Sequence, residues 1–569
     1  MVTLESKVES VSEDTLEEEE RYPENGIKGL KHWRQDMFAG FIVALVSVPL
    51  SLGIAIASGA PPIAGIFSEI IAGLIFPFLG GAYVTISGPA AGLAPVLFSS
   101  ITALGRGDME VGYRMVLGVI MFAGVVQIAL TYFKAARLSY LIPRSVVQGM
   151  LAAIGLLIMA KQIPNFLGYK SSAHEFFGLI AEGPGHILNS SIAVLTISSV
   201  CLALLFLLPK SRIRWIKWMP AHLFVVLVGI ALGQLFHIAP QFLVDVPANP
   251  LAGGLVTPDF GALFSDASLI PTIIIALLAL TFVDGTESLA TIHAVDQIDP
   301  FKRKSNPHRT LFAMGVSNIC SSLVGGLTII PGIIKSSTNI VAGGRTAWVN
   351  FYNAVFLILF LLVFGELIRM IPVATLAAVL MHIGYKLAGP NKWSHVAKLG
   401  PDQFIVFATT VLATVCTDLL VGIACGVLVK IGILLYFSLK CSCKRAHGVY
   451  EFAKNFWLAF VKLFRNPVKE IVRDGDSVEI RFKGSLTCFN HLFVRAAVDE
   501  QLKTASLVKI KICTSVGVVD HSSTTYLQML ADEAASSHHG LGAVVVEGLN
   551  DLRCCTAEES SLHFRTKIA

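Results

Sequence analysis

The chain has 569 residues, of which 54% are hydrophobic and only 15% are charged. Soluble domains carry roughly 25% charged residues, so this composition excludes an ordinary soluble protein and indicates an integral membrane protein. The formal net charge of +5 gives no sign of a nucleic-acid partner.

The chain begins with a polar segment, residues 1–29, that contains the acidic run Glu17–Glu20. This segment lacks the apolar stretch of a secretory signal peptide. We predict a disordered, cytoplasmic tail, and a partner-binding tail is the functional alternative.

Apolar segments follow from about residue 37 to residue 439. A bilayer core requires roughly 20 apolar residues per helix, and two of the segments are short or interrupted. We predict fourteen spans in a transmembrane domain at 30–440, at about 37–57, 62–80, 84–103, 113–132, 145–165, 190–209, 219–238, 270–291, 308–326, 332–345, 349–369, 371–388, 402–417 and 418–439.

The loop charges alternate along the chain. Basic residues precede the first span and follow the fourth, sixth, eighth and last, whereas the loop at about 239–268 contains Asp245, Asp259 and Asp266 and no Lys or Arg. The positive-inside rule then places both termini in the cytosol with an even number of spans. The basic residues are Lys31, Arg34, Lys134, Arg137, Arg144, Lys210, Arg212, Arg214, Lys217, Lys302, Arg303, Lys304, Arg309, Lys440, Lys444 and Arg445.

Two broken apolar segments, Thr85–Gly92 and Leu327–Ser337, occupy corresponding places in the two halves. Each joins an extended run to a short helix through a Gly/Pro hinge at membrane depth. Irregular backbone persists there only where protein or water satisfies it, and paired breaks mark the binding site of repeat-built transporters. Two half-helix N-termini that face each other suit an anion.

The composition changes again after about residue 440. The cytoplasmic linker 441–474 carries aromatic and basic residues suited to the lipid headgroup region. A small α/β domain is expected at 475–569, with strands at 478–482, 507–512 and 542–546 and helices at 490–503 and 522–537. The pairs Cys441/Cys443 and Cys554/Cys555 lack the ligand set of a zinc site, so we expect reduced thiols.

Several motifs together resemble the SulP family of anion transporters over residues 30–569. The resemblance implies a membrane α-helical fold of two inverted seven-helix repeats (about 30–238 and 265–440), a cytoplasmic STAS domain that can meet a regulatory partner, and a homodimer in the cell (inner or plasma) membrane. The motifs are Val48-Pro49, Pro61-Pro62-Ile63-Ala64-Gly65-Ile66-Phe67-Ser68, Ile86-Ser87-Gly88-Pro89, Lys335-Ser336-Ser337-x-Asn339, Gly343-Gly344-Arg345-Thr346 and Val518-Val519-Asp520-His521-Ser522-Ser523.

The same resemblance places the anion between the starts of the third and tenth spans. Lys335 stands where many relatives have arginine. Lysine keeps the positive charge but lacks the planar guanidinium that binds an oxyanion through two hydrogen bonds. Ala90 replaces a hydroxyl residue of bicarbonate-transporting relatives, and Leu50 replaces a common glutamine, so the anion stays open. The implied substrate-binding residues are Gly88, Pro89, Ala90, Ala91, Gly332, Ile333, Ile334 and Lys335.

Glu287 is the charged residue within a span that most strongly indicates a function, because a charge at the bilayer centre costs about 2.5–3.5 kcal/mol on insertion scales. Thr291 lies one helical turn later on the same face, and this oxygen pair could hold sodium, whereas the carboxylate alone could carry a proton. The resemblance implies a cation-coupling role for Glu287. The structural alternative is a pair with a neighbouring helix, through Lys335. Asp284 either assists in coupling or caps a broken turn.

The other charged residues allow simpler interpretations. Glu69 forms either a gating contact or a packing bridge, and Lys335 either attracts the anion or joins the repeats in a salt bridge. Glu366, Arg369 and Asp418 lie toward helix ends, as snorkelling or paired residues do. In the STAS-like loop, His521 replaces a phosphorylatable serine, so Asp520 and Ser522 are read as helix caps.

We therefore predict a secondary active transporter of a small inorganic anion, with an elevator-type motion implied by the resemblance. Bicarbonate with sodium symport leads, and sulfate or another oxyanion with proton symport or exchange is the alternative. A passive anion channel is the alternative of another class, and the carboxylate at Glu287 argues against it. No enzyme or ATP-driven pump is expected, since the chain has no Gly-Lys dipeptide of a P-loop, no Gly-x-Ser-x-Gly elbow and no His-Glu-x-x-His site. No cofactor beyond a sodium ion is expected.

Overall fold

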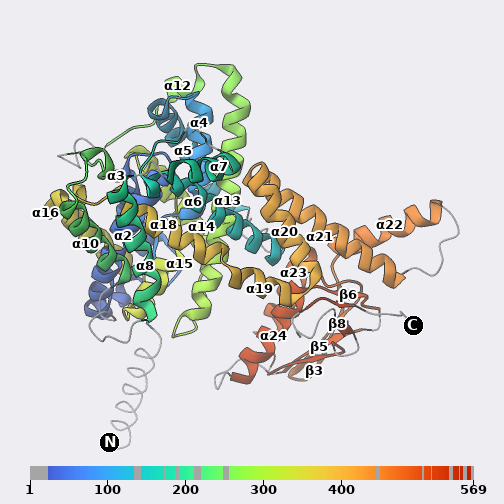
Figure 1. Ribbon diagram of the computed structural model, residues 1–569. Helices are drawn as coiled ribbons and strands as arrows, with labels where there is room; N and C mark the ends of the chain where they lie inside the picture. The colour runs from blue at the N-terminus through green and yellow to red at the C-terminus, as the bar shows by residue number, and fades with distance from the viewer. Residues whose placement is uncertain are drawn as a thin grey trace, which may run out of the picture. The chain divides into compact units, whose positions relative to one another are not determined.

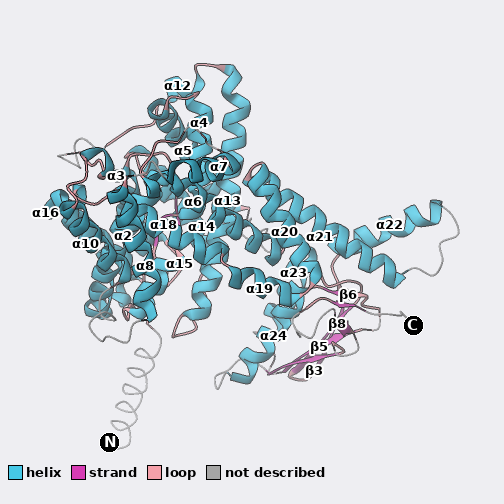
Figure 2. Ribbon diagram, in the orientation of Figure 1, coloured by secondary structure: helices cyan, strands magenta, loops and turns pink. Residues whose placement is uncertain are grey.

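The computed structural model describes residues 23–133, 142–171, 173, 175–187, 191–210, 220–247, 255–442, 449–502, 505, 507–513, 515–536, 543–549, 552–554 and 561–564. Figures 1 and 2 show a bundle of helices followed by a small α/β region. Two compact units are distinguished, residues 1–136 with 154–387, and residues 137–153 with 388–569.

Each expected apolar segment contains a helix. Eight helices of the described residues are long and apolar enough to cross a membrane, and four more apolar helices are shorter. The helices are α2 (Trp33–Ala57), α3 (Pro62–Leu79), α4 (Ala94–Gly105), α5 (Met109–Tyr132), α6 (Arg144–Leu167), α8 (Ile192–Leu207), α10 (Ala221–Leu235), α13 (Ile270–Ile298), α14 (Pro307–Leu323), α15 (Ile333–Val341), α16 (Trp348–Val363), α18 (Val373–Ala388), α20 (Pro401–Cys416) and α21 (Leu419–Ser442).

Shorter helices connect these elements or lie beside them. They are η1 (Gly26–His32), η2 (Ala91–Leu93), α7 (Phe176–Ile187), η4 (Leu208–Lys210), η5 (Pro240–Phe242), α12 (Phe260–Phe264), η6 (Ala267–Leu269), α17 (Gly365–Arg369) and α19 (Pro390–Leu399).

The two predicted breaks form short strands that pair with each other. Strand β1 (Ser87–Pro89) runs antiparallel to β2 (Ile329–Pro331), with Gly88 opposite Ile330. The chain continues from β1 through η2 into α4, and from β2 through Gly332 into α15. Pairing across the two halves satisfies backbone groups that lipid could not.

The helices around this strand pair pack in corresponding ways. Helix α5 packs along α13 and α14, and α16 packs along α2 and α3. Small residues permit both close crossings: a Cβ at Gly124 would lie 2.6 Å from the Gly315 carbonyl oxygen, and one at Gly73 would lie 2.6 Å from the Ala354 Cβ.

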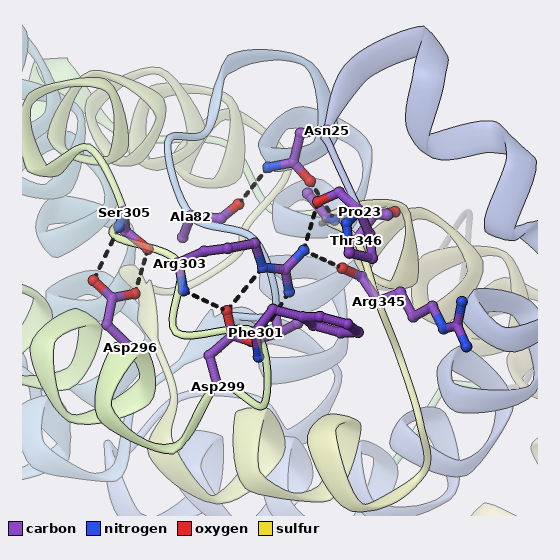
Figure 3. A network of polar contacts seen from close by, with 12 residues as sticks. Pro23, Asn25, Ala82, Asp296, Asp299, Phe301, Arg303, Ser305, Arg345 and Thr346 are labelled. Carbon is purple, nitrogen blue, oxygen red and sulfur yellow. Dashed lines mark hydrogen bonds and ion pairs between the residues drawn. The ribbon is translucent and has the colours of Figure 1, made fainter. Parts of the chain in front are cut away.

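The prediction of a disordered tail at 1–29 is wrong for residues 23–29, which are folded against the helices, and residues 1–22, with the acidic run Glu17–Glu20, lie outside the described residues. The Arg303 guanidinium donates to Asp299 (2.8 and 3.1 Å) and to the backbone oxygens of Pro23 (2.7 Å) and Arg345 (2.8 Å) (Figure 3). Asn25 bridges the carbonyl of Ala82 and the N–H of Ala347. Polar contacts to distant loops, which the local pattern does not contain, order this segment.

The C-terminal region is a two-layer α/β unit. Its four-stranded sheet has the order β3-β4-β5-β7, with only β3 antiparallel, and its helices pack into one apolar core with alternate residues of the strands. The elements are α22 (Val449–Phe464), β3 (Val468–Asp474), β4 (Ser477–Phe482), η7 (Cys488–Asn490), α23 (His491–Gln501), β5 (Leu507–Ile512), α24 (His521–Ser536) and β7 (Ala543–Glu547).

The three predicted strands and two predicted helices are present, but the domain boundary at 475 was wrong. Strand β3, inside the expected linker, pairs with β4 through the turn at Asp474–Ser477. A second small sheet joins β6 (Val518–Val519), β9 (His563–Phe564) and β8 (Arg553–Cys554). Cys443 and Cys555 and the predicted basic residues Lys134, Arg137, Arg212, Arg214, Lys217, Lys444 and Arg445 lie outside the described residues.

Candidate functional site

Side chains of the second half hold the backbone that leads into β1. The N–H of Ile86 donates to Ser336 Oγ at 2.9 Å, and the N–H of Ser87 donates to Asn350 Oδ1 at 3.0 Å. The Asn339 amide donates to the Val84 carbonyl at 2.7 Å. Ser336 thereby fixes backbone that lies 250 residues earlier in the chain, directly before β1.

The start of α15 presents free N–H groups to an open surface. The first hydrogen bond of the helix runs from the N–H of Ser336 to the Gly332 carbonyl. The N–H groups of residues 333–335 therefore have no acceptor within the helix. Ile333 is 44% exposed, and Gly332 and Ile334 are partly exposed. The N–H of Gly332 donates to the Ile86 carbonyl at 2.8 Å, so the expectation that it faces the ligand is wrong in this conformation.

The start of α4 is more enclosed. Gly88 and Pro89 are buried in β1, and Pro89 has no N–H to donate. Ala90 precedes η2 and accepts a bond from the Leu93 N–H, which leaves the N–H groups of Ala91 and Gly92 ahead of it. The two helix starts therefore follow opposite ends of one short strand pair.

Lys335 is buried beside Gly88 and forms an ion pair with Glu69 of α3. Its Nζ lies 2.6 Å from Glu69 Oε2 and 3.3 Å from Ser51 Oγ. The Glu69 carboxylate also accepts bonds from Ser47 (2.6 Å), Asn353 (3.2 Å) and the Ser51 hydroxyl. The alternative in which Lys335 pairs with Glu287 is wrong, because Lys335 pairs with the carboxylate of Glu69, in the first half of the chain.

Glu287 of α13 lies against the start of α4. A Cβ at Gly92 would collide with both carboxylate oxygens, so only glycine allows this approach. Oε2 of Glu287 is buried and has no hydrogen-bond partner among the described residues. A carboxylate oxygen that is buried without a donor requires a cation, a proton or water to offset its desolvation.

Asp284, one turn before Glu287, ties α13 to its neighbours. Oδ2 of Asp284 accepts bonds from Gln127 of α5 (2.7 Å) and Asn318 of α14 (3.0 Å). Asn318 also donates to the Gln127 amide oxygen and accepts from the N–H of Ile329 in β2 (2.7 Å). Asp284 therefore positions the strand pair, rather than capping a broken turn.

The two buried clusters correspond to each other across the chain. One links α2, α3 and α16 through the Ser47, Glu69 and Asn353 side chains, and the other links α13, α14 and α5 through Asp284, Asn318 and Gln127. In each, a polar residue of the second helix of one half joins the first helix of that half to the fourth helix of the other.

Thr291 is buried on α13 one turn beyond Glu287. Helix α13 packs against α4, η2, α15 and β2, so both residues belong to an element that contacts both helix starts. The described residues contain no cluster of three or more His, Cys, Asp or Glu side chains placed to hold a metal ion together. A free carboxylate oxygen and a hydroxyl fit the oxygen ligands that hard cations take. The sodium role of Glu287 and Thr291 stays a prediction.

Sequence patterns did not identify the amide residues that hold the site. Gln127, Asn318, Asn350 and Asn353 are buried, and the available signal in the sequence was an amide residue within an apolar segment. Glu366 and Arg369 pair with each other (2.9 Å), and Asp418 caps the start of α21. In the C-terminal region, Asp520 accepts from the N–H of Ser523 as the expected cap of α24, whereas no such bond involves Ser522 among the described residues.

Comparisons with known proteins agree with this architecture. A profile described as the sulfate permease family matches residues 33–410. The chain is 27% identical over 406 residues to the putative sulfate transporter YvdB of Bacillus subtilis, covering 70% of this chain and 73% of that protein.

Two solved structures share the fold. The transmembrane domain of a cyanobacterial bicarbonate transporter, BicA, matches with a TM-score of 0.61 and 23% identity, covering 69% of this chain and 97% of that one. The murine anion transporter Slc26a9 in its inward-facing state matches with a TM-score of 0.62 and 15% identity, covering 90% of this chain and 85% of that one. The profile spans more than half of the sequence, and the chain therefore belongs to the sulfate permease family of membrane anion transporters.

Proposed function

We propose that this chain is a secondary active transporter that binds a small inorganic anion between the starts of α4 and α15 and couples its movement to a cation. Bicarbonate with sodium is the pair we favour. Glu287 and Thr291 would hold the sodium ion, and Gly88, Pro89, Ala90, Ala91, Ile333, Ile334 and Lys335 would surround the anion. Its motion would be of the elevator type, with two inverted repeats that the corresponding helix packing supports.

The observation that carries this proposal is the place of the Glu287 carboxylate. It lies at Gly92, at the helix start where an anion would be attracted, and one of its oxygens lacks a donor. An anionic carboxylate there opposes a second anion until a cation or proton neutralises it. A cation at Glu287 therefore favours the substrate, which is the energetic basis of symport.

The net charge of the Lys335–Glu69 pair is zero, so we assign most of the anion attraction to the free N–H groups of the two helices. Such donors accept many oxyanions, and sulfate with proton symport or exchange is therefore the alternative. The bicarbonate assignment follows the cyanobacterial relative and rests on likeness of fold.

We further propose that the C-terminal α/β region is a STAS domain, that the chain forms homodimers, and that both termini are cytoplasmic in the cell membrane. The apolar exterior of the described helices supports membrane insertion. The parallel β4-β5-β7 core, with two helices packed on it, supports the STAS assignment.

The test is uptake of labelled bicarbonate and of labelled sulfate into proteoliposomes, with and without inward sodium and proton gradients. We expect sodium to stimulate uptake of one anion in the wild type, and Glu287→Gln to remove the stimulation. The matched control is Glu366→Gln, because Glu366 is 86% exposed and pairs with Arg369 at a helix end. Uptake that depends on neither gradient and is retained in Glu287→Gln would favour the passive channel.

A further inference from the structure

Lys161 is a charged residue of α6 that the site described above does not use. Its Nζ lies 3.7 Å from the centroid of the Phe98 ring of α4. Both side chains are only partly buried, and no carboxylate among the described residues pairs with this ammonium. An ionisable group in a membrane span is costly to insert and therefore demands a partner or a function.

Phe98 connects this lysine to the half-helix of the site. It lies four residues after Ala94, about 6 Å along the helix axis. The ring also abuts the turn at Gly59 between α2 and α3, where a Cβ would come within 3.1 Å. Lys161 therefore lies beside the half-helix α4, on the side that the basic loops place away from the cytosol.

The contact is also of a kind that can be exchanged. The lysine ammonium of α6 reaches the ring of α4 by a cation–π contact and not by an ion pair. A cation over an aromatic ring gains about 0.5–2 kcal/mol, less than a desolvated ion pair offers. Lysine has a flexible stem and three donors, so its ammonium can leave the ring when an anion arrives.

We propose that Lys161 is a second anion-docking group, which captures the substrate on the non-cytoplasmic side before it reaches the starts of α4 and α15. Phe98 holds the ammonium in place while no anion is bound. This inference rests on the proposed transport function for its purpose, whereas the binding itself can be tested without transport.

The transport test compares Lys161→Gln, Lys161→Arg and Phe98→Leu in the proteoliposome assay. Lys161→Gln should raise the half-saturating anion concentration by about three- to tenfold, because one nearby charge is lost, with little change in maximal rate. Lys161→Arg should preserve the wild-type value, and Phe98→Leu should leave it equal or lower. The control is Lys386→Gln, an exposed lysine of another membrane helix, α18.

The binding test measures acylation of Lys161 by a water-soluble amine reagent, using mass spectrometry at fixed pH. Bicarbonate or sulfate should slow the acylation of Lys161 relative to Lys386. An unchanged half-saturation in Lys161→Gln, or a Phe98→Leu variant as impaired as Lys161→Gln, overturns the docking role. Absence of transport in the wild type would instead reject the proposed function, and absence of anion protection at Lys161 would then reject the docking site independently.

Discussion

Lys335 and Glu69 form a buried pair in which each charge depends on the other. Both side chains are at most 2% exposed, and Ser51 contacts both of them. A Cβ at Gly88 would lie 2.9 Å from the Lys335 Nζ, so the pair fixes how closely β1 approaches α15. Of the two roles expected for Lys335, the geometry supports the salt bridge that joins the halves; its effect on the anion stays a prediction.

This arrangement predicts a marked difference between single and double substitutions. Removing one member of a buried pair leaves an uncompensated charge and destabilises by about 3–5 kcal/mol, whereas replacing both by apolar residues can be nearly neutral. We expect Lys335→Met and Glu69→Met each to lower the unfolding temperature in detergent, and the double variant to recover most of the loss. A double variant as unstable as the sum of the two singles would show that the residues act separately.

At the scale of elements, the loop after α13 holds the N-terminal segment, residues 23–29, against the helices. The Arg303 guanidinium contacts the Tyr83 and Phe301 rings, at 4.6 and 4.8 Å from their centroids. Its donors reach Asp299, Pro23 and Arg345 (Figure 3). Asp36 of α2 in turn accepts the N–H groups of Arg345 and Thr346. The sequence alone identifies Arg303 only as one of the basic residues of a loop.

We predict that Arg303→Lys releases this segment, because lysine cannot supply a planar fork to Asp299 and two further carbonyls at once. Amide hydrogen exchange of residues 23–36 should become faster while the fold of the helices persists. The control is Arg309→Lys, in which an exposed arginine of α14 keeps its charge. Equal protection of these amides in both variants would mean that the guanidinium does not hold the segment in place.

At the scale of the whole molecule, an apolar junction joins the last membrane helix to the C-terminal region. Leu434 and Leu435 of α21 pack with Leu463 of α22, and with Cys488 and Val518 of the α/β region. Cys488 is fully buried, and burial together with the neighbouring Asp520 raises the pKa of its thiol well above the ordinary value of 9.0. The junction therefore excludes water and disfavours a thiolate.

Cys488 consequently reports on this junction. We expect it to resist N-ethylmaleimide in the native protein from pH 7 to pH 9, while the exposed Cys416 reacts. Above pH 9 the unfolded chain ionises this thiol and the folded chain does not, so the stability of the region should fall as the pH rises. Peptide mapping by mass spectrometry measures both cysteines; equal labelling would contradict a closed junction.

The sequence by itself determined the membrane class, the position of each helical segment, the strand breaks at β1 and β2, and the strands β4, β5 and β7. These features depend on local composition, on periodicity and on Gly/Pro hinges, all of which a single stretch of chain contains. The sequence also singled out Lys335, Glu287 and Asp284 as costly charges within spans.

Only the tertiary structure decided which group each of these charges meets. Lys335 contacts Glu69, which lies 266 residues earlier, and Asp284 contacts Gln127, which lies 157 residues earlier. It also decided that Gly92 lies against Glu287, that residues 23–29 are folded, and that β3 belongs to the sheet. Contacts between distant segments follow from how helices and strands pack, and no local spacing in the chain encodes such a pairing.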